Sequence, residues 1–163
     1  MGTIRANRFR RILWVVIAIL VFVGDQVTKA AVEHSIPEHT TIPVLPHCLN
    51  LIHTKNAGAA FGLFSDSPAL WKTALLIVVS SLLLAMVCAV MWRSRQLHWV
   101  TGVGLALILG GALSNLCDRI CLGRVVDFID LYCRGYHWPT FNLADSAIVV
   151  GAGLLVLQLI FLE

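Results

Sequence analysis

The chain has 163 residues, of which 58% are hydrophobic and 13% are charged, and its net charge is +3. Because a soluble domain carries about 25% charged residues, this composition and a mean hydropathy of +0.84 exclude an ordinary soluble protein and indicate a membrane protein. The small net charge gives no reason to expect nucleic-acid binding, and the length allows a single membrane domain, residues 1–163.

Four apolar segments predict four membrane-spanning helices. The first, about residues 12–32, lacks the cleavage site of a removable signal peptide. The second and third, about 73–92 and 97–117, carry no charged residue, and the fourth covers about 146–162. Each segment is near the roughly 20 residues that cross a bilayer. We therefore expect an all-α polytopic membrane protein.

Arginine residues predict the orientation of these helices. Four precede the first helix and two lie between the second and third, whereas acidic residues balance the basic ones in segments 33–72 and 118–145. The positive-inside rule therefore predicts cytoplasmic N- and C-termini. Both balanced segments then lie on the outer face, which in a bacterium is the periplasm or the cell exterior.

The outer segments are not ordinary loops. Residues 41–64 mix proline and glycine with short apolar runs, which predicts short strands or a small sheet lying on the membrane. Residues 118–140 contain Tyr132, Tyr136 and Trp138, and such aromatic residues favour the membrane interface.

Two pairs of residues with helical spacing predict contacts within the membrane. Asp25 and Lys29 stand four apart in the first helix, in the favourable order for an ion pair that would let this helix tolerate both charges. Ala147 and Gly151 form a small-residue face that would let the fourth helix approach a neighbour closely.

The five cysteines give only a weak indication of a metal site. Cys88 lies in an apolar run and is expected to be a small buried hydrophobic residue, while Cys117 and Cys121 can face the same side of a helix. No histidine pattern accompanies them. We expect neither a structural metal ion nor a required disulfide, and no cofactor.

Asp127 and Asp145 are the strongest candidates for chemistry. Each lies among apolar residues beside a long apolar helix, where a carboxylate is costly to place. Two converging carboxyl groups that share a proton can activate water and protonate a leaving group. The alternatives are that Asp145 caps the fourth helix and Asp127 is a turn acid. Asp130 is interpreted as a solvated loop acid.

Three asparagines and an arginine accompany these acids. Asn142 can orient a carboxylate or bind a substrate carbonyl, or simply cap the fourth helix. Asn56 lies in a glycine-containing segment and can approach a ligand, or is a turn asparagine. Asn115 and Arg119 share a helix face. Arg119 can bind a carbonyl, a phosphate or an acid, or is an interface arginine that extends toward water.

Five ordered motifs together resemble lipoprotein signal peptidase, or signal peptidase II, along nearly the whole chain. They are GDQVTK at 24–29, NAGAAFG at 56–62, GGALSNLCDR at 110–119, VVDF at 125–128 and FNLADS at 141–146. The resemblance implies four transmembrane helices with a small periplasmic β-cradle and an interfacial segment. It also implies an aspartic endopeptidase that cleaves prolipoproteins just before a diacylglyceryl-modified cysteine.

The same resemblance implies roles for individual residues and partners. Asp127 and Asp145 would be the catalytic dyad. Phe61 and Phe64 would lie near the lipid-bearing substrate, although packing is the more ordinary role of such residues. Membrane lipids and globomycin-like cyclic peptide inhibitors are further expected partners. The residues expected to bind substrate or support the site are Asp25, Lys29, Asn56, Gly58, Asn115, Arg119, Asn142 and Ala144.

Two other classes of function remain open from the sequence. A small proton-coupled transporter would use its membrane carboxylates to carry protons. The charges, however, gather near one face, and the centres of the second and third helices have no ionisable residue. A structural assembly subunit would give no reason for the ordered asparagine and aspartate motifs.

Overall fold

The computed structural model describes residues 2–58, 70–94 and 97–161. Within these ranges it has four helices, each long and apolar enough to cross a membrane. They are α1 (Gly2–Ser35), α2 (Leu70–Arg93), α3 (Trp99–Leu122) and α4 (Leu143–Phe161). The prediction of four spanning helices is confirmed. Asp66, Arg95 and the two phenylalanines expected near the substrate, Phe61 and Phe64, lie outside the described residues.

Helix α3 extends beyond the segment expected from hydropathy. It continues past Cys117 to Leu122, and Gly123 then adopts a left-handed conformation with φ 69° and donates its N–H to the carbonyl oxygen of Arg119. The polar residues Asp118 and Arg119 therefore lie near the end of the helix, as the shared helix face predicted for Asn115 and Arg119 requires. This places them at a fixed position beside the end of the bundle.

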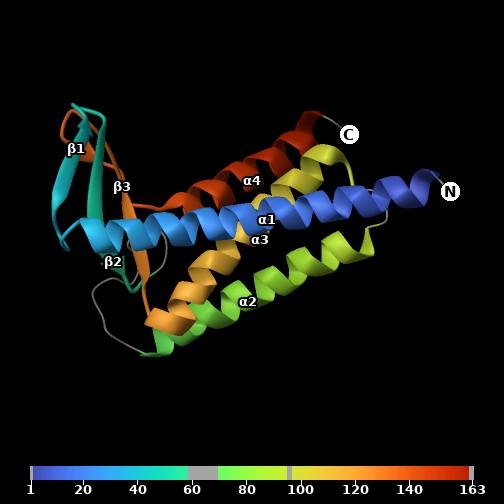
Figure 1. Cartoon of the computed structure of the whole chain (residues 1–163), viewed down its shortest axis with the longest axis horizontal. Coiled ribbons are helices and arrows are strands. Elements are labelled where there is room, and N and C mark those ends of the chain that lie inside the picture. Colours follow the sequence, from blue (N-terminus) through green and yellow to red (C-terminus); the bar gives the residue numbers. More distant parts are fainter. Residues whose placement is uncertain (1, 59–69, 95–96, 162–163) are drawn as a thin grey trace.

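Helix α3 is the centre of the bundle and packs against α1, α2 and α4 (Figure 1). Glycines allow these close approaches: a Cβ atom on Gly110 would collide with the backbone of Ala18 in α1, and one on Gly111 with that of Ala144 in α4. A Cβ atom on Gly151 would lie 2.6 Å from the carbonyl oxygen of Gly104. The predicted close packing along Ala147 and Gly151 is confirmed, since both residues are buried.

The expectation that Cys88 is buried is wrong. Helix α2 packs mainly against α3, with Leu84 and Val87 on the contacting face, and Cys88 is exposed on the protein surface. A long apolar run in a membrane helix includes residues that face lipid, so hydropathy did not distinguish the two environments. Cys117 and Cys121 do face the same side of α3, with their Sγ atoms 4.0 Å apart.

The two segments that are predicted to lie on the outer face form a small antiparallel sheet in the order β1-β2-β3-β4. Its strands are β1 (Thr41–Leu45), β2 (Leu49–Asn56), β3 (Val125–Cys133) and β4 (Tyr136–His137). The prediction of short strands in the first outer segment is thereby confirmed for residues 41–56.

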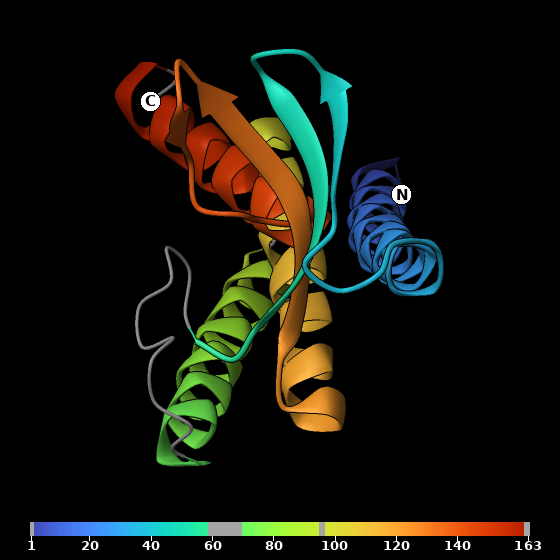
Figure 2. The same cartoon turned by 90° about the vertical axis from the view of Figure 1, so that its left-hand side faces the viewer.

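The sheet lies across one end of the helix bundle, opposite the end at which the chain starts and finishes (Figures 1 and 2). The 34 residues of α1 correspond to about 50 Å, which exceeds the ~30 Å of a hydrocarbon core. The additional length supports the sheet: Val32 of α1 and Ile36, which directly follows the helix, form a buried cluster with Val126 and Phe128 of β3. Because side chains alternate along a strand, Asp127 points to the other face of β3.

The interpretation of Asp130 as a solvated loop acid is also wrong. Asp130 lies in β3 and is 4% exposed. Asn50 of β2 donates a hydrogen bond of 2.8 Å to its Oδ2 atom, and the Nδ1 atom of His137 lies 2.8 Å from its Oδ1 atom. Its partners come from two other strands, so hydrogen bonds within the sheet explain how this carboxylate can be buried.

Candidate active site

Strand pairing positions Asp127 beside Asn56. Asp127 pairs across the sheet with Thr54 of β2, and Asn56 lies two residues further along the same face of that strand. The Nδ2 atom of Asn56 donates a hydrogen bond of 2.9 Å to Oδ2 of Asp127. Asn56 also has the turn role considered above, because its Oδ1 atom accepts the backbone N–H of Gly58 over 2.8 Å. Asp127 is thus a strand residue, not a turn acid.

A bridge between Phe141 and Ile129 brings the start of α4 to the same place. The two residues exchange backbone hydrogen bonds of 2.8 and 3.1 Å, which fixes the chain just before Asn142 against β3. Asn142 then caps α4 by accepting the backbone N–H of Asp145 on its Oδ1 atom. Asp145 in turn accepts the backbone N–H of Asn142 at 3.3 Å, as in a capping box.

Asn142 connects the two candidate carboxyl groups. Its Nδ2 atom donates a hydrogen bond of 2.8 Å to Oδ1 of Asp127, while its backbone N–H faces Asp145. Both acids line one cavity of about 630 Å³ between the sheet and α4. The capping role and the carboxylate-orienting role of Asn142 therefore coexist in one fully buried side chain.

Burial is the main reason that the pKa of Asp127 rises, to about 6. The hydrogen bond from Asn56 lowers the pKa and so opposes this rise, whereas the nearby negative charge of Asp145 adds to it. Asp127 is 2% exposed. A carboxyl group with such a pKa can hold and release a proton close to neutral pH, as general acid–base chemistry requires.

Asn115 and Arg119 of α3 complete the wall of the site. The Nδ2 atom of Asn115 donates a hydrogen bond of 2.8 Å to Oδ1 of Asp145. Arg119 donates to the backbone carbonyl oxygens of Asn115, at 3.1 Å, and of Gly58, at 3.2 Å. Arg119 lines the cavity beside both acids and faces the site.

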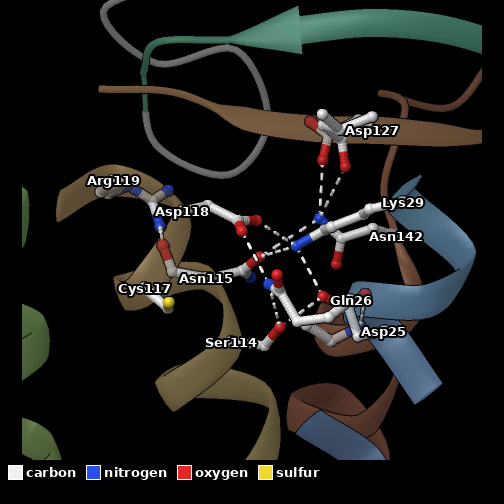
Figure 3. Close-up of polar contacts among 12 residues, drawn as sticks. Asp25, Gln26, Lys29, Ser114, Asn115, Cys117, Asp118, Arg119, Asp127 and Asn142 are labelled. Atoms are coloured by element: carbon white, nitrogen blue, oxygen red, sulfur yellow. Dashed lines mark hydrogen bonds and ion pairs between the residues drawn. The ribbon is translucent and has the colours of Figure 1, made fainter. Parts of the chain in front are cut away.

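A buried charge cluster lies directly behind these residues (Figure 3). The Nζ atom of Lys29 is 2.6 Å from a carboxylate oxygen of Asp25 and 2.6 Å from one of Asp118. The predicted pairing of Asp25 with Lys29 is confirmed, but it is not the whole explanation. Asp118 is a further acid of the cluster that the sequence did not single out. Ser114 donates a hydrogen bond to Asp25, and Gln26 donates one to Asp118.

Asp25 also holds the first turn of α4. Its Oδ1 atom accepts the backbone N–H of Ala144 over 2.8 Å. Ala144 is completely buried, and its carbonyl group packs against Gly111 of α3. The charge cluster is thereby connected to the residue that immediately precedes Asp145. All ten residues singled out from the sequence lie in or directly beside this arrangement.

A second, smaller cavity of about 260 Å³ lies between α2, α3 and α4. Apolar side chains dominate its wall, and it meets the larger cavity at four shared residues, Asn115, Arg119, Asp145 and Ile148. Apolar space therefore extends in two directions from the polar residues. An elongated apolar ligand with one polar segment would fit this arrangement.

The polar groups provide the components of metal-independent hydrolysis. Two acids in one cavity can share a proton, with amide N–H groups directed at both of them. In the described part of the chain, no group of three or more His, Cys, Asp or Glu side chains is placed to hold a metal ion.

A family model and named relatives agree on one family. The model for signal peptidase (SPase) II matches residues 17–161, a range that contains every candidate site residue. The lipoprotein signal peptidase of Solibacter usitatus is 43% identical, with coverage of 88% of this chain and 88% of that protein. That of Xanthomonas oryzae pv. oryzae is 43% identical, with coverage of 86% and 84%. A solved bacterial membrane enzyme has a TM-score of 0.81 at 33% identity, with coverage of 90% and 87%.

Proposed function

This chain belongs to the signal peptidase II family of membrane aspartic peptidases, and we propose that it removes signal peptides from lipid-modified prolipoproteins. The observation that carries the proposal is the meeting of Asp127 and Asp145 in one cavity, at the end of a membrane helix bundle. Both acids are tied to neighbouring amides, so their positions are set before substrate arrives.

In the proposed reaction the two acids share one proton. The ionised carboxylate takes a proton from a water molecule as that water attacks the scissile carbonyl carbon. The protonated carboxyl group donates a hydrogen bond to the developing oxyanion. As the C–N bond breaks, the carboxyl group that took the water proton gives it to the leaving amine, so the pair again holds one proton. Arg119 lies close enough to the cavity to bind a substrate carbonyl, in addition to its two bonds with backbone oxygens.

The two cavities support the substrate class. A prolipoprotein brings an apolar signal helix and a diacylglyceryl chain, both of which favour the membrane, to the same short polar segment. The apolar spaces that meet beside Asp145 would take these two parts, with the bond before the modified cysteine at their junction. Globomycin-like cyclic peptides would compete for the same space.

The arrangement of charges supports the proposed orientation. Arginines flank the bundle end that carries the chain termini, and the sheet and the site lie at the other end. By the positive-inside rule, both termini are cytoplasmic and the site faces the periplasm of a bacterial inner membrane. Water from the outer face would then reach the dyad through the polar segment.

Cleavage of a lipidated prolipoprotein by the purified protein tests this proposal. We expect the wild type to release the signal peptide and Asp127→Asn and Asp145→Asn to be inactive, although both accumulate in the membrane. Asp130→Asn is the matched control, because Asp130 is a buried acid of the same strand whose described partners lie in the sheet. Cleavage by either dyad variant would refute the mechanism. Proton flux in proteoliposomes without cleavage would support a transporter instead.

A further inference from the structure

The Lys29 ammonium is buried and has a hydrogen-bond acceptor for each of its N–H groups. It is 4% exposed and donates to Asp25 Oδ2 at 2.6 Å, to Asp118 Oδ2 at 2.6 Å and to Asn115 Oδ1 at 2.9 Å (Figure 3). An ammonium group has three N–H donors and no acceptor. All of its hydrogen-bonding capacity is therefore used within the protein, and one of the three bonds points toward the catalytic site.

That third bond fixes the orientation of the Asn115 amide. Because Oδ1 of Asn115 faces the ammonium, its Nδ2 atom faces Asp145, to which it donates over 2.8 Å. Rotation of the amide by half a turn would place N–H groups against Lys29 and an oxygen against the Asp145 carboxylate. Both contacts would be repulsive, so Lys29 fixes which atom Asn115 presents to Asp145. A longer bond of 3.3 Å from Nδ2 of Asn142 to the same oxygen acts in the same direction.

Asp118 holds the ammonium on the α3 side. Asp118 lies three residues after Asn115 on the same helix and therefore on the same face. The Nε2 atom of Gln26 fixes its other oxygen over 2.7 Å, so the carboxylate has a defined position. Asp25 approaches Lys29 from α1 and has separate tasks, since it also accepts hydrogen bonds from Ser114 and from the backbone of Ala144.

We propose that Asp118 is a positioning residue of the peptidase: it holds the Lys29 ammonium against Asn115 and so keeps the Asn115 amide directed at Asp145. This inference rests on the proposed function. Asp118 itself is buried and acts only through Lys29 and Asn115. Its loss therefore leaves the walls of the substrate cavity intact but misdirects one of the two carboxyl groups. Turnover falls while substrate binding changes little.

A double-mutant cycle separates this role from a contribution to folding alone. The four proteins are wild type, Asp118→Asn, Asn115→Ala and the double variant, each purified in its folded form and assayed with one lipidated prolipoprotein. We expect Asn115→Ala to lower kcat by about 100-fold, the scale for losing one preorganised donor. Asp118→Asn should lower kcat by about tenfold with KM within about twofold, in line with effects of small misplacements in active sites.

The decisive result is the double variant. If Asp118 acts through Asn115, adding Asp118→Asn to Asn115→Ala causes no further loss of kcat, because the amide that it orients is already gone. Multiplicative losses would overturn the inference, and so would a wild-type kcat for Asp118→Asn. Thr28→Val is the matched control, because within the described residues the Thr28 hydroxyl donates only to carbonyl oxygens of its own helix.

A milder variant keeps the test valid if Asp118→Asn does not fold. Gln26→Leu removes one anchor of Asp118 and preserves both charges of the ion pair. We expect it to lower kcat several-fold in the wild-type background and not at all beside Asn115→Ala; an equal loss in both backgrounds would overturn the inference. Cleavage by Asp127→Asn or Asp145→Asn would instead refute the proposed function. Inactive dyad variants with a fully active Asp118→Asn would refute only the positioning role.

Discussion

Replacing Asn56 by alanine tests how the structure sets the proton affinity of Asp127. Burial raises the pKa of Asp127 to about 6, and the Asn56 hydrogen bond of 2.9 Å opposes that rise by stabilising the charged form. A hydrogen bond to a charged group contributes about 1.5–3 kcal/mol, and one pKa unit corresponds to about 1.4 kcal/mol. We therefore expect Asn56→Ala to raise the pKa of Asp127 by about one to two units.

The assay is the pH dependence of kcat/KM for prolipoprotein cleavage. Its alkaline limb reports loss of the proton that the pair of acids must hold in the free enzyme. Because a raised pKa keeps the carboxyl group protonated to higher pH, this limb moves in the alkaline direction in Asn56→Ala. Thr54→Val is the control: Thr54 lies opposite Asp127, but in the described part of the chain its hydroxyl bonds only the backbone oxygen of Asp127 and the hydroxyl of Thr140. An unmoved or acid-shifted limb in Asn56→Ala would refute the reasoning.

Three further outcomes follow from packing, charge and topology. Gly151→Ala places a Cβ atom 2.6 Å from the Gly104 carbonyl oxygen, so thermal unfolding should show a decrease of about 1–3 kcal/mol in the free energy of unfolding. Gly153→Ala is the control and should show no decrease, because the space around Gly153 is open. Equal stabilities of the two variants would contradict the close helix contact. Lys29→Met leaves two buried acids without their cation and should lower the free energy of unfolding by about 3–5 kcal/mol. The variant should therefore accumulate poorly in the membrane. Accumulation and an unfolding temperature equal to those of the wild type would contradict the stabilising role of the charge cluster. A variant that keeps only Cys133, exposed in β3, should react with an impermeant maleimide from the outer face, and reaction only after permeabilisation would reverse the proposed orientation.

Much of the fold could be predicted because membrane helices and costly acids leave strong patterns. Hydropathy alone located all four spanning helices, and the small residues at Ala147 and Gly151 predicted a real contact. The placement of Asp127 and Asp145 among apolar residues also predicted that their carboxyl groups converge. The structure brings them into one cavity through the bridge between Phe141 and Ile129, which no local sequence pattern predicts.

Two of the missed features, at Asp118 and Asp130, depend on partners that become neighbours only in the folded protein. Asp118 belongs to the motif at 110–119 and to the charge balance, but neither pattern marks it as a site residue, because its partner Lys29 is 89 residues away. Asp130 was interpreted as solvated because its partners, Asn50 and His137, become neighbours only when the sheet forms. Cys88 was misplaced for a different reason: in a membrane helix, apolar character is equally consistent with the protein interior and with lipid.

The side-chain amides of the three asparagines in the site are oriented in the same way. In each, the side-chain oxygen is occupied by an obligate donor: the backbone N–H of Gly58 for Asn56, the ammonium of Lys29 for Asn115, and the backbone N–H of Asp145 for Asn142. The opposite end of each amide can therefore present only N–H groups to the dyad. Donors fixed in advance need no reorganisation when charge develops during the reaction. Aspartate in any of these positions would keep the shape but replace a donor with a negative charge that faces the dyad.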